Sequence, residues 1–329
     1  MKRRYLLAAG AATFVAVPAW VGAQSAAWPT RGPIRLIAQF PPGGLVDTVS
    51  RLIAPHLSQA LGGQTVIVEN RAGAGGLIGT DYVSRQPADG YPLLVSHASV
   101  HVHATATRRV MPFDPVADFA HLGMLVEAPM VLLVRPQSAY QTLEQYVTAA
   151  KTKPVRYGSS GIGSANHLFG EMLKLEGKAP QHDHIPYQGS APAMLDLLGG
   201  QIDSLFDPVT TNVAQLKAGS LRALAVSTPA RLPALPNVPT FAELGYPKLT
   251  GSQWLGLSAP KGLPAPIAQR LSALIPEILA KPDVATRLDE LQTLARKTPV
   301  LGNDFVQVIA SQIDTWRAVA KQANVEVIT

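Results

Sequence analysis

The chain has 329 residues, of which 47% are hydrophobic and 15% charged, and it contains no cysteine. This length and apolar content allow a large buried core and predict two domains, while the lack of cysteine excludes disulfide bonds, thiolate catalysis and cysteine-bound metals. The net charge of +6 includes three cations within the first four residues, and no basic block follows, so we expect no nucleic-acid partner.

The first 23 residues have the pattern of a signal peptide. Basic residues at positions 2–4 precede an apolar run over 5–21, and Val21-Gly22-Ala23 is a small-residue cleavage site before Gln24. The run is short for a membrane helix, and no later segment has the ~18 unbroken apolar residues that such a helix needs. We therefore expect a soluble protein exported to the periplasm. Ordinary secretion is favoured, and Arg3-Arg4 leaves a twin-arginine route open.

The next stretch predicts a strand, a tight loop and a helix. Ile34 to Phe40 is an apolar run with β-branched members, and Leu45 to Leu61 repeats apolar residues at helical spacing. Between them, Pro41-Pro42-Gly43-Gly44 forces a turn. Its glycine amides precede a helix, where unpaired N–H groups and the helix dipole favour an anion. A carboxylate would fit there, although the loop could equally be a plain strand-to-helix connection.

A second unit of the same kind follows at once. Thr65 to Asn70 predicts a strand, residues 71–76 a second glycine-rich turn, and Leu77 to Arg85 a helix. We expect the two amide-rich loops to face one crevice, because open α/β sheets bind ligands at the carboxyl ends of their strands. The glycine spacing is similar to a dinucleotide-binding turn, but the next strand lacks the acidic residue that holds a ribose, so no cofactor is expected.

A third strand, Tyr91 to Ser96, ends in polar residues. The hydroxyl groups of Ser96 and Ser99 are candidate ligand donors at this strand end. Three histidines lie in the same stretch: His97, His101 and His103. No acidic residue lies among them and no His-Glu-x-x-His pattern occurs, so surface or pocket-lining roles are favoured and no metal site is expected.

A second series of elements begins near residue 119 and has its own polar loop. Apolar segments predict strands over 122–126 and 130–134, and Thr142 is the expected N-cap of a helix over Leu143 to Lys151. A strand starting at Val155 leads into a Gly/Ser turn before a helix over 168–176. Three hydroxyl groups lie at the start of that helix: Ser159, Ser160 and Ser164.

Two acidic residues lie nearest the predicted crevice. Asp207 follows a predicted strand and could accept a hydrogen bond from a ligand, while Asp47 lies in the first turn of a helix. Each could instead satisfy nearby backbone groups, which is the favoured interpretation for Asp47. The other predicted elements are a strand over 184–186, a helix over 193–198, strands over 202–206, 221–227 and 254–260, and helices over 266–280 and 302–323.

A serine hydrolase is the rival function from another class. Ser160, His167 and Asp207 can be drawn as a triad, and Ser164 is a second candidate nucleophile. The Gly-x-Ser-x-Gly nucleophile elbow is absent, however, and serines at helix starts are usually caps or anion contacts. We therefore expect a binding protein rather than an enzyme.

Several motifs occur in one order along the chain after the predicted signal peptide. They are Phe-Pro-Pro-Gly-Gly-x-x-Asp at 40–47, Val-Glu-Asn-Arg-x-Gly-Ala-Gly-Gly-x-x-Gly at 68–79, Asp-Gly-Tyr at 89–91, Tyr-Gln-Gly at 187–189, Leu-Gly-Gly-Gln-Ile-Asp at 198–203, Phe-Asp at 206–207 and Leu-Arg-Ala-Leu-Ala-Val at 221–226. Together they resemble the Bug/TctC family, the extracytoplasmic solute receptors of tripartite tricarboxylate transport systems. The resemblance implies an α/β, type II-like periplasmic binding protein with a ligand cleft between two lobes and no chemistry performed. Lobe 1 would comprise 27–127 and 251–329, and lobe 2 would comprise 128–250.

The resemblance also implies how the ligand is held: main-chain amides and ordered waters at the two glycine loops would bind a carboxylate without an arginine. It assigns Phe40, Gly43, Gly44, Ala72, Gly73 and Ala74 in lobe 1, and Ser159, Ser160, Gly163, Ser164, Gln188, Gly189 and Asp207 in lobe 2. Family members often carry Tyr-Lys-Gly and Phe-Asp-Asn where this chain has Gln188 and Pro208.

The expected ligand is a small organic carboxylate: a di- or tricarboxylate, an amino acid or an aromatic acid. The expected partners are the membrane permease subunits of a tripartite tricarboxylate transporter, and the receptor itself is expected to be a monomer. A receptor that signals to a sensor protein instead of feeding transport is the remaining alternative.

Overall fold

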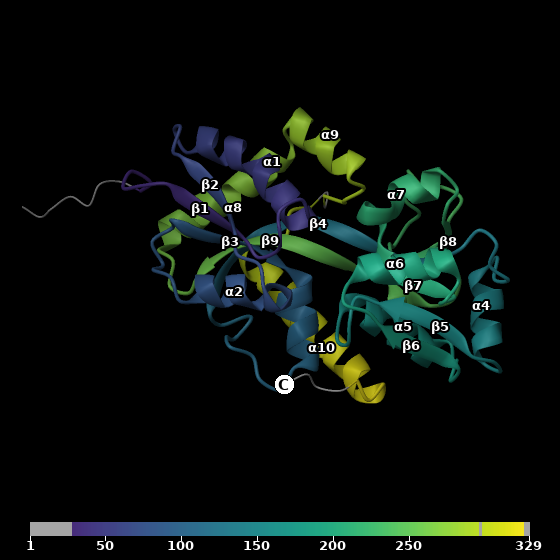
Figure 1. The fold of residues 1–329 in the computed structure, drawn as a ribbon. Coiled ribbons are helices and arrows are strands. Elements are labelled where there is room, and N and C mark those ends of the chain that lie inside the picture. Colours follow the sequence, from purple (N-terminus) through teal and green to yellow (C-terminus); the bar gives the residue numbers. More distant parts are fainter. Residues whose placement is uncertain (1–27, 296–297, 326–329) are drawn as a thin grey trace, which may run out of the picture.

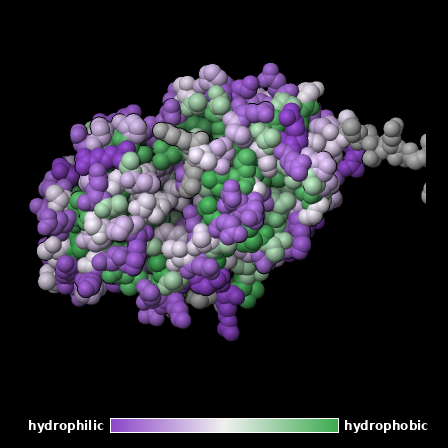
Figure 2. Space-filling view, turned by 180° about the vertical axis from the view of Figure 1, so that it is seen from behind, coloured by the Kyte–Doolittle hydropathy of each residue, from purple (hydrophilic) through white to green (hydrophobic). Residues whose placement is uncertain are grey.

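The structure is a computed structural model that describes residues 28–295 and 298–325, so the predicted signal peptide and its cleavage site lie outside the described residues. Across these two ranges, every helix is either too short or too polar to cross a bilayer. Viewed from behind, hydrophilic side chains are spread over much of the surface, with smaller hydrophobic groups between them (Figure 2).

A nine-stranded mixed sheet forms the centre of the molecule (Figure 1), in the order β2-β1-β3-β9-β4-β7-β5-β6, and β8 also pairs with β4. The strands are β1 (Ile34–Ala38), β2 (Val66–Asn70), β3 (Pro92–His97), β4 (Phe119–Val134), β5 (Val155–Ser159), β6 (His182–Pro186), β7 (Ser204–Pro208), β8 (Arg222–Val226) and β9 (Ser252–Pro260). The helices are α1 (Leu45–Ala60), α2 (Leu77–Ser84), α3 (Thr105–Thr107), α4 (Leu143–Ala150), α5 (Ala165–Glu176), α6 (Ser190–Gly199), α7 (Val209–Lys217), α8 (Ala265–Leu279), α9 (Pro282–Glu290) and α10 (Gly302–Gln322). Three short helical segments are η1 (Ala74–Gly76), η2 (Ser99–Ala104) and η3 (Pro247–Leu249).

The pairing of β4 divides the sheet into two lobes. We call β1, β2, β3, β9 and the first part of β4 lobe 1, and β5 to β8 with the last part of β4 lobe 2. Strand β4 pairs with β9 as far as Pro129 and with β7 from Met130 onward. The sequence predicted two separate strands here, and that prediction is wrong because β4 is continuous. Pro129 has no N–H, and this missing donor lies where the partner changes.

The parallel strands of each lobe end at a common edge. In lobe 1, β1 runs parallel to β2 and β3, and in lobe 2, β5 runs parallel to β6 and β7. The glycine- and serine-rich loops follow the carboxyl ends of these strands. The topology therefore places the predicted ligand loops where open α/β sheets bind ligands.

Apolar helix faces pack on the sheet and hold these strand ends in place. In α1, the buried residues Val46, Val49, Ile53 and Leu57 recur at helical spacing and join the core of lobe 1. In lobe 2, helix α6 packs on β5 and β7 and contributes buried apolar side chains to a second core cluster. Burial of these faces fixes the direction in which each helix N-terminus points.

Helix α10 joins the two lobes. It packs on β4, η2 and α3 and also on α5 of lobe 2 (Figure 1). The Trp316 ring of α10 lies 5.2 Å from the His103 ring in η2 and 4.9 Å from the Phe169 ring in α5. One core cluster accordingly contains buried residues from both lobes.

Candidate functional site

The loop after β1 leads into a helix N-terminus that no side chain caps. Residues 41–44 are exposed, and Gly44 is the N-cap of α1 without a side-chain hydrogen bond to the cap. Gly43 has a φ of +84°, a left-handed conformation that favours glycine. An N-terminus that no side chain caps keeps first-turn N–H groups available to an outside acceptor.

Asp47 fixes the shape of this loop from inside the protein. The residue is 4% exposed, and its side chain accepts hydrogen bonds from the Gly43 amide (3.0 Å), Arg51 Nε (3.0 Å) and Asn70 Nδ2 (2.9 Å). The Arg51 hydrogen bond is the main cause that lowers the pKa of Asp47 to about 2. Asn70 also donates to the Phe40 carbonyl at 3.1 Å, so this network joins the first loop to the end of β2.

The second glycine loop follows β2 and leads through η1 into α2. Ala72 and Ala74 are exposed, and within the described residues the amides of Ala72 and Gly73 have no hydrogen-bond acceptor. Gly76 has a φ of +98°, and a Cβ there would lie 2.7 Å from Val100 Cγ2 in η2. Glycine is therefore required for the close approach of this loop to η2, and the approach keeps the loop amides at the surface.

Phe40, His97 and Ser99 form a contiguous group beside the glycine loops. The Phe40 and His97 rings meet edge to face at 5.4 Å, and the His97 Nδ1 atom lies 2.7 Å from Ser99 Oγ and accepts from the Ser99 amide at 3.1 Å. Burial lowers the pKa of His97 to about 4, so the ring is neutral at pH 7. Ser99 is half-buried, whereas Ser96 is fully buried with its hydroxyl 3.0 Å from Ser258 Oγ.

In lobe 2, the hydroxyl groups of the Gly/Ser loop mostly stabilise the loop itself. Ser164 is the N-cap of α5, and its hydroxyl donates to the Gly161 carbonyl at 2.7 Å. Ser160 donates to Asn166 Oδ1 at 3.0 Å and is half-buried, whereas Ser159 is fully buried. Of the three predicted serines, Ser160 and Ser164 therefore retain some access to the surface.

A stacked pair of histidines holds this loop at both ends. The His167 and His184 rings lie 3.7 Å apart at an interplanar angle of 11°. The Gly163 amide donates to His167 Nδ1 at 3.1 Å, and Ser159 Oγ lies 2.6 Å from His184 Nε2. Burial lowers the pKa of His167 to about 4 and that of His184 to about 3, so both rings are neutral at pH 7. Gly163 therefore uses its N–H within the protein.

Asp207 joins the N-terminal ends of three helices. It is 3% exposed and accepts from Asn166 Nδ2 (2.9 Å), Ser190 Oγ (2.7 Å), Thr211 Oγ1 (3.0 Å) and Asn212 Nδ2 (2.7 Å). Burial raises the pKa of this carboxyl, and the four hydrogen bonds oppose that rise. These donors come from α5, α6 and α7.

The turn between β6 and α6 completes the polar edge of lobe 2. Gln188 is exposed, and Gly189 is the N-cap of α6 without a side-chain hydrogen bond to the cap. Main-chain N–H groups are therefore available here as they are at the first glycine loop. The predicted residues of lobe 2 are thus brought to one sheet edge, with Gln188 and Gly189 at its surface.

A cavity of about 530 Å³ lies between α6 and α7. It is lined by Ser190, Ala191, Met194, Leu195, Asp207, Pro208, Thr211, Asn212 and Gln215. Of this set, only Asp207 was predicted as a site residue, and helix α7 was not predicted. Thr211 and Asn212 lie four and five residues after Asp207. Had a helix over Val209–Lys217 been predicted, this spacing would have placed both side chains near Asp207.

The geometry does not assemble the triad that the sequence allowed. Ser160 donates to Asn166, His167 Nδ1 accepts from Gly163, and Asp207 is bound by other side chains. Within the described ranges, no hydrogen bond joins Ser160, His167 and Asp207. Nor do His, Asp or Glu side chains in that part of the chain gather in a group of three or more that could hold a metal ion.

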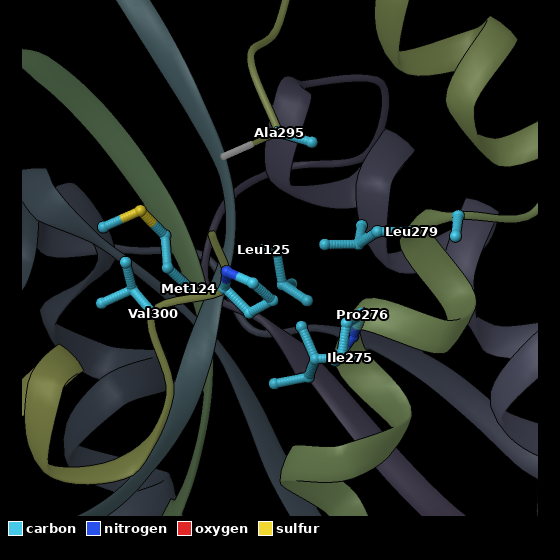
Figure 3. Close-up of a pocket in the computed structure, with 9 residues that line it drawn as sticks. Met124, Leu125, Ile275, Pro276, Leu279, Ala295 and Val300 are labelled. Carbon is cyan, nitrogen blue, oxygen red and sulfur yellow. The ribbon is translucent and has the colours of Figure 1, made fainter. Parts of the chain in front are cut away.

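A separate apolar cavity of about 400 Å³ lies in lobe 1 (Figure 3). Leu125 of β4 points toward Ile275 and Leu279 of α8 across it, and Met124 lines it from the other side of β4. None of the glycine- or serine-rich loops lines this cavity. The candidate ligand donors and this cavity are therefore distinct features.

Comparison with known sequences identifies relatives over most of the chain. The model of the tripartite tricarboxylate transporter family receptor, TctC, matches residues 49–325. Protein BugT of Bordetella pertussis is 35% identical over 302 residues, which is 90% of this chain and 90% of BugT. A protein in the tcbD-tcbE intergenic region of Pseudomonas sp. (strain P51) is 36% identical over 296 residues, covering 88% of this chain and 86% of the relative.

Solved structures show the same architecture. The periplasmic binding protein BugD superimposes with a TM-score of 0.77 at 32% identity, covering 91% of this chain and 100% of BugD. R. palustris Rpa4515, solved with adipate, has a TM-score of 0.79 at 31% identity over 92% and 100% of the two chains. MatC from Rhodopseudomonas palustris, solved with bound malate, has a TM-score of 0.76 at 30% identity over 89% and 99%.

These likenesses confirm the predicted two-lobed α/β fold of a periplasmic binding protein. The chain belongs to the tripartite tricarboxylate transporter receptor family, the Bug/TctC family that its motifs predicted.

Proposed function

We propose that this protein is a periplasmic receptor that captures a small organic carboxylate between its lobes and delivers it to a membrane permease. The observation that carries the proposal is the pair of neighbouring glycine loops after β1 and β2, whose exposed amides are held in position by Asp47 and Asn70. Related structures solved with adipate and with malate support a carboxylate as the class of ligand.

At the first loop the ligand carboxylate would bind the Gly44 amide, while the Gly43 amide donates to Asp47 and so shapes the loop. At the second loop it would bind at Ala72 to Ala74. Phe40 and Ser99 would lie beside it, since both are near these loops and partly accessible. Buried Asp47 and Ser96 act as supports for the loops in this proposal, because the protein's own groups surround them. Amide donors bind an anion without a fixed counter-charge, which suits a receptor that must later release it.

Lobe 2 would close over the exposed part of the ligand. Ser160, Ser164, Gln188 and Gly189 provide the accessible hydroxyl, amide and main-chain groups on that side, while Ser159, Gly163 and Asp207 hold their loops in shape. A ligand that contacts both lobes favours the closed conformation, because only that conformation makes both sets of contacts. Lobe boundaries near residues 127 and 250 remain part of this proposal.

Delivery to a permease, export by the N-terminal signal and a monomeric state rest on the family and the sequence. Transport of a bound carboxylate into cells that carry the permease, compared with cells lacking this receptor, tests the delivery step. Equal uptake in both would oppose a transport role and favour the signalling alternative.

The main-chain donors can be tested one at a time by removing an N–H. Gly44 has a φ of −77°, which proline adopts, and a Cβ there would lie an ordinary 3.6 Å from the Pro41 carbonyl oxygen. Gly44→Pro therefore deletes one amide donor at a φ that proline adopts. We expect the affinity for the best carboxylate, found by calorimetric screening, to fall by about tenfold to a hundredfold, as for a hydrogen bond to a charged group.

The matched control is Gly44→Ala, which keeps the N–H and adds only a methyl group at ordinary contact distance from the Pro41 carbonyl oxygen. We expect it to bind within about twofold of the natural chain, since the donor is unchanged. Equal binding by Gly44→Pro and the natural chain would contradict amide recognition at this loop. A screen in which sugars or cations bind and no carboxylate does would contradict the proposed function as a whole.

A further inference from the structure

The polar edge of lobe 2 lacks positively charged side chains. Three segments lie at the carboxyl ends of β5, β6 and β7, over residues 159–164, 187–190 and 207–212, and none of them contains lysine or arginine. The two histidines closest to the first of these segments, His167 and His184, are stacked and neutral at pH 7. A second carboxylate on the ligand would therefore find no cation from these segments.

Four side-chain donors of this edge are already committed to a carboxyl group of the protein. Asp207 takes hydrogen bonds from Asn166, Ser190, Thr211 and Asn212, each 3.0 Å or shorter. These donors lie in the first two turns of α5, α6 and α7, where helix N-termini favour negative charge. The carboxyl group of Asp207 thus occupies the position in lobe 2 that suits an anion best, and an ionised Asp207 repels a second anion close to it.

The cavity beside Asp207 has apolar walls. Ala191, Met194, Leu195 and Pro208 line it, together with neutral polar side chains from α7. Leu195 is 70% exposed, so most of its side chain is in contact with water. Covering such a surface with an apolar group is favourable by about 25 cal/mol per Å². The volume of about 530 Å³ is ample for an aliphatic chain or an aromatic ring.

We infer that the receptor selects carboxylates whose far end is uncharged and apolar, and that the cavity between α6 and α7 receives this end. The inference rests on the proposed function, in which the glycine loops of lobe 1 hold the carboxylate. The main-chain amides at Gly189 are available to a carbonyl or hydroxyl oxygen in the same ligand. Dicarboxylates of equal length bind less tightly, because their second charge would lie between Asp207 and apolar side chains.

Matched ligand pairs test the charge of the far end. Titration calorimetry at pH 7.5 compares hexanoate with adipate, octanoate with suberate, and 4-methylbenzoate with terephthalate. In every pair that binds, we expect the monocarboxylate to bind at least about tenfold more tightly, a difference of about 1.4 kcal/mol. A dicarboxylate that binds as tightly as its partner or more tightly overturns the inference and leaves the proposed function standing. Binding of no member of any pair counts against both.

Two exposed leucines of α6 provide a matched pair of variants. Leu195 lines the cavity, whereas Leu198 is 45% exposed and does not line it. We expect Leu195→Gln to weaken binding of the tightest monocarboxylate by about fivefold or more, and Leu198→Gln to leave it within about twofold. Leu195 is mostly exposed and Leu198 is nearly half exposed, so we expect both variants to fold. Equal affinities of the two variants would place the far end of the ligand elsewhere and overturn the assignment of this cavity.

Discussion

At the scale of single residues, the two aspartates nearest the cleft are both bound by the protein itself. Asp47 accepts from Gly43, Arg51 and Asn70, and Asp207 accepts from donors in α5, α6 and α7. The sequence indicates an acid near each loop but leaves open whether it faces a ligand. The answer depends on side chains distant in sequence, such as Asn70 for Asp47 and Asn166 for Asp207.

Asp47→Asn should lower the free energy of unfolding by about 2 kcal/mol at pH 7, because the charged carboxylate is the form that Arg51 and the Gly43 amide stabilise. The pKa of Asp47 is below its unfolded value, so this contribution is complete above about pH 4 and is lost as the pH falls toward about 2. Urea unfolding at pH 7 and at pH 3 measures the difference between variant and natural chain.

Asp81→Asn is the control for this experiment. Asp81 also pairs with an arginine four residues later, Arg85, but this arginine side chain is 67% exposed and the pair lies at the surface. We expect a loss of less than about 0.5 kcal/mol. Equal losses for the two variants would show that the pairing with arginine alone, rather than the buried network at the loop, accounts for the effect of Asp47.

At the scale of elements, sequence patterns located most of the units that carry the site. Helix α1 was predicted over 45–61 and observed over Leu45–Ala60, and Thr142 caps α4 by accepting from the Gln145 amide, as predicted. Helices α7 and α9 were not predicted. In α7, β-branched and polar residues weaken the apolar repeat, and only Val209 and Asn212 are buried. Two of the four donors to Asp207, Thr211 and Asn212, could not be foreseen without that helix.

Helix α10 gives a test of how the lobes are joined. Trp316 is 7% exposed and lies between His103 of η2 and Phe169 of α5. Trp316→Ala should lower the free energy of unfolding by about 3–5 kcal/mol, since truncation leaves a cavity between the elements. Denaturant unfolding followed by far-UV circular dichroism measures it.

On the same helix, Arg317 has an exposed side chain and pairs with Asp314 one turn away. Arg317→Ala should therefore change stability by less than about 0.5 kcal/mol. If Trp316→Ala also lowered the free energy of unfolding by less than about 0.5 kcal/mol, α10 would not hold α5 and η2 together.

At the scale of the whole molecule, buried histidines couple stability to pH. Burial lowers the pKa of seven histidines, His97, His101, His103, His121, His167, His182 and His184. These rings lie in both lobes, and most of them contact other aromatic rings. They stay neutral in the folded protein at pH values where the unfolded chain binds protons.

We therefore expect stability to fall as the pH drops from about 6.5, the ordinary pKa of histidine, toward about 4. Each buried ring contributes up to about 1.4 kcal/mol per pH unit over this range, because the unfolded state takes up the proton. Thermal melting between pH 7.5 and 5 measures the effect above the range in which ordinary carboxyl groups titrate. An unchanged melting temperature across that interval would contradict neutral buried rings.

The strand that changes partner at Pro129 has a mechanical consequence. Because β4 belongs to both halves of the sheet, we expect reorientation of the halves to concentrate in the dihedral angles at residues 129 and 130, where the ladder passes from β9 to β7. The loops at the strand ends would then travel as rigid bodies, keeping their internal hydrogen bonds. Binding would then bring two preformed surfaces together. The loops would be ordered before the ligand binds, so binding would cost little additional loop entropy.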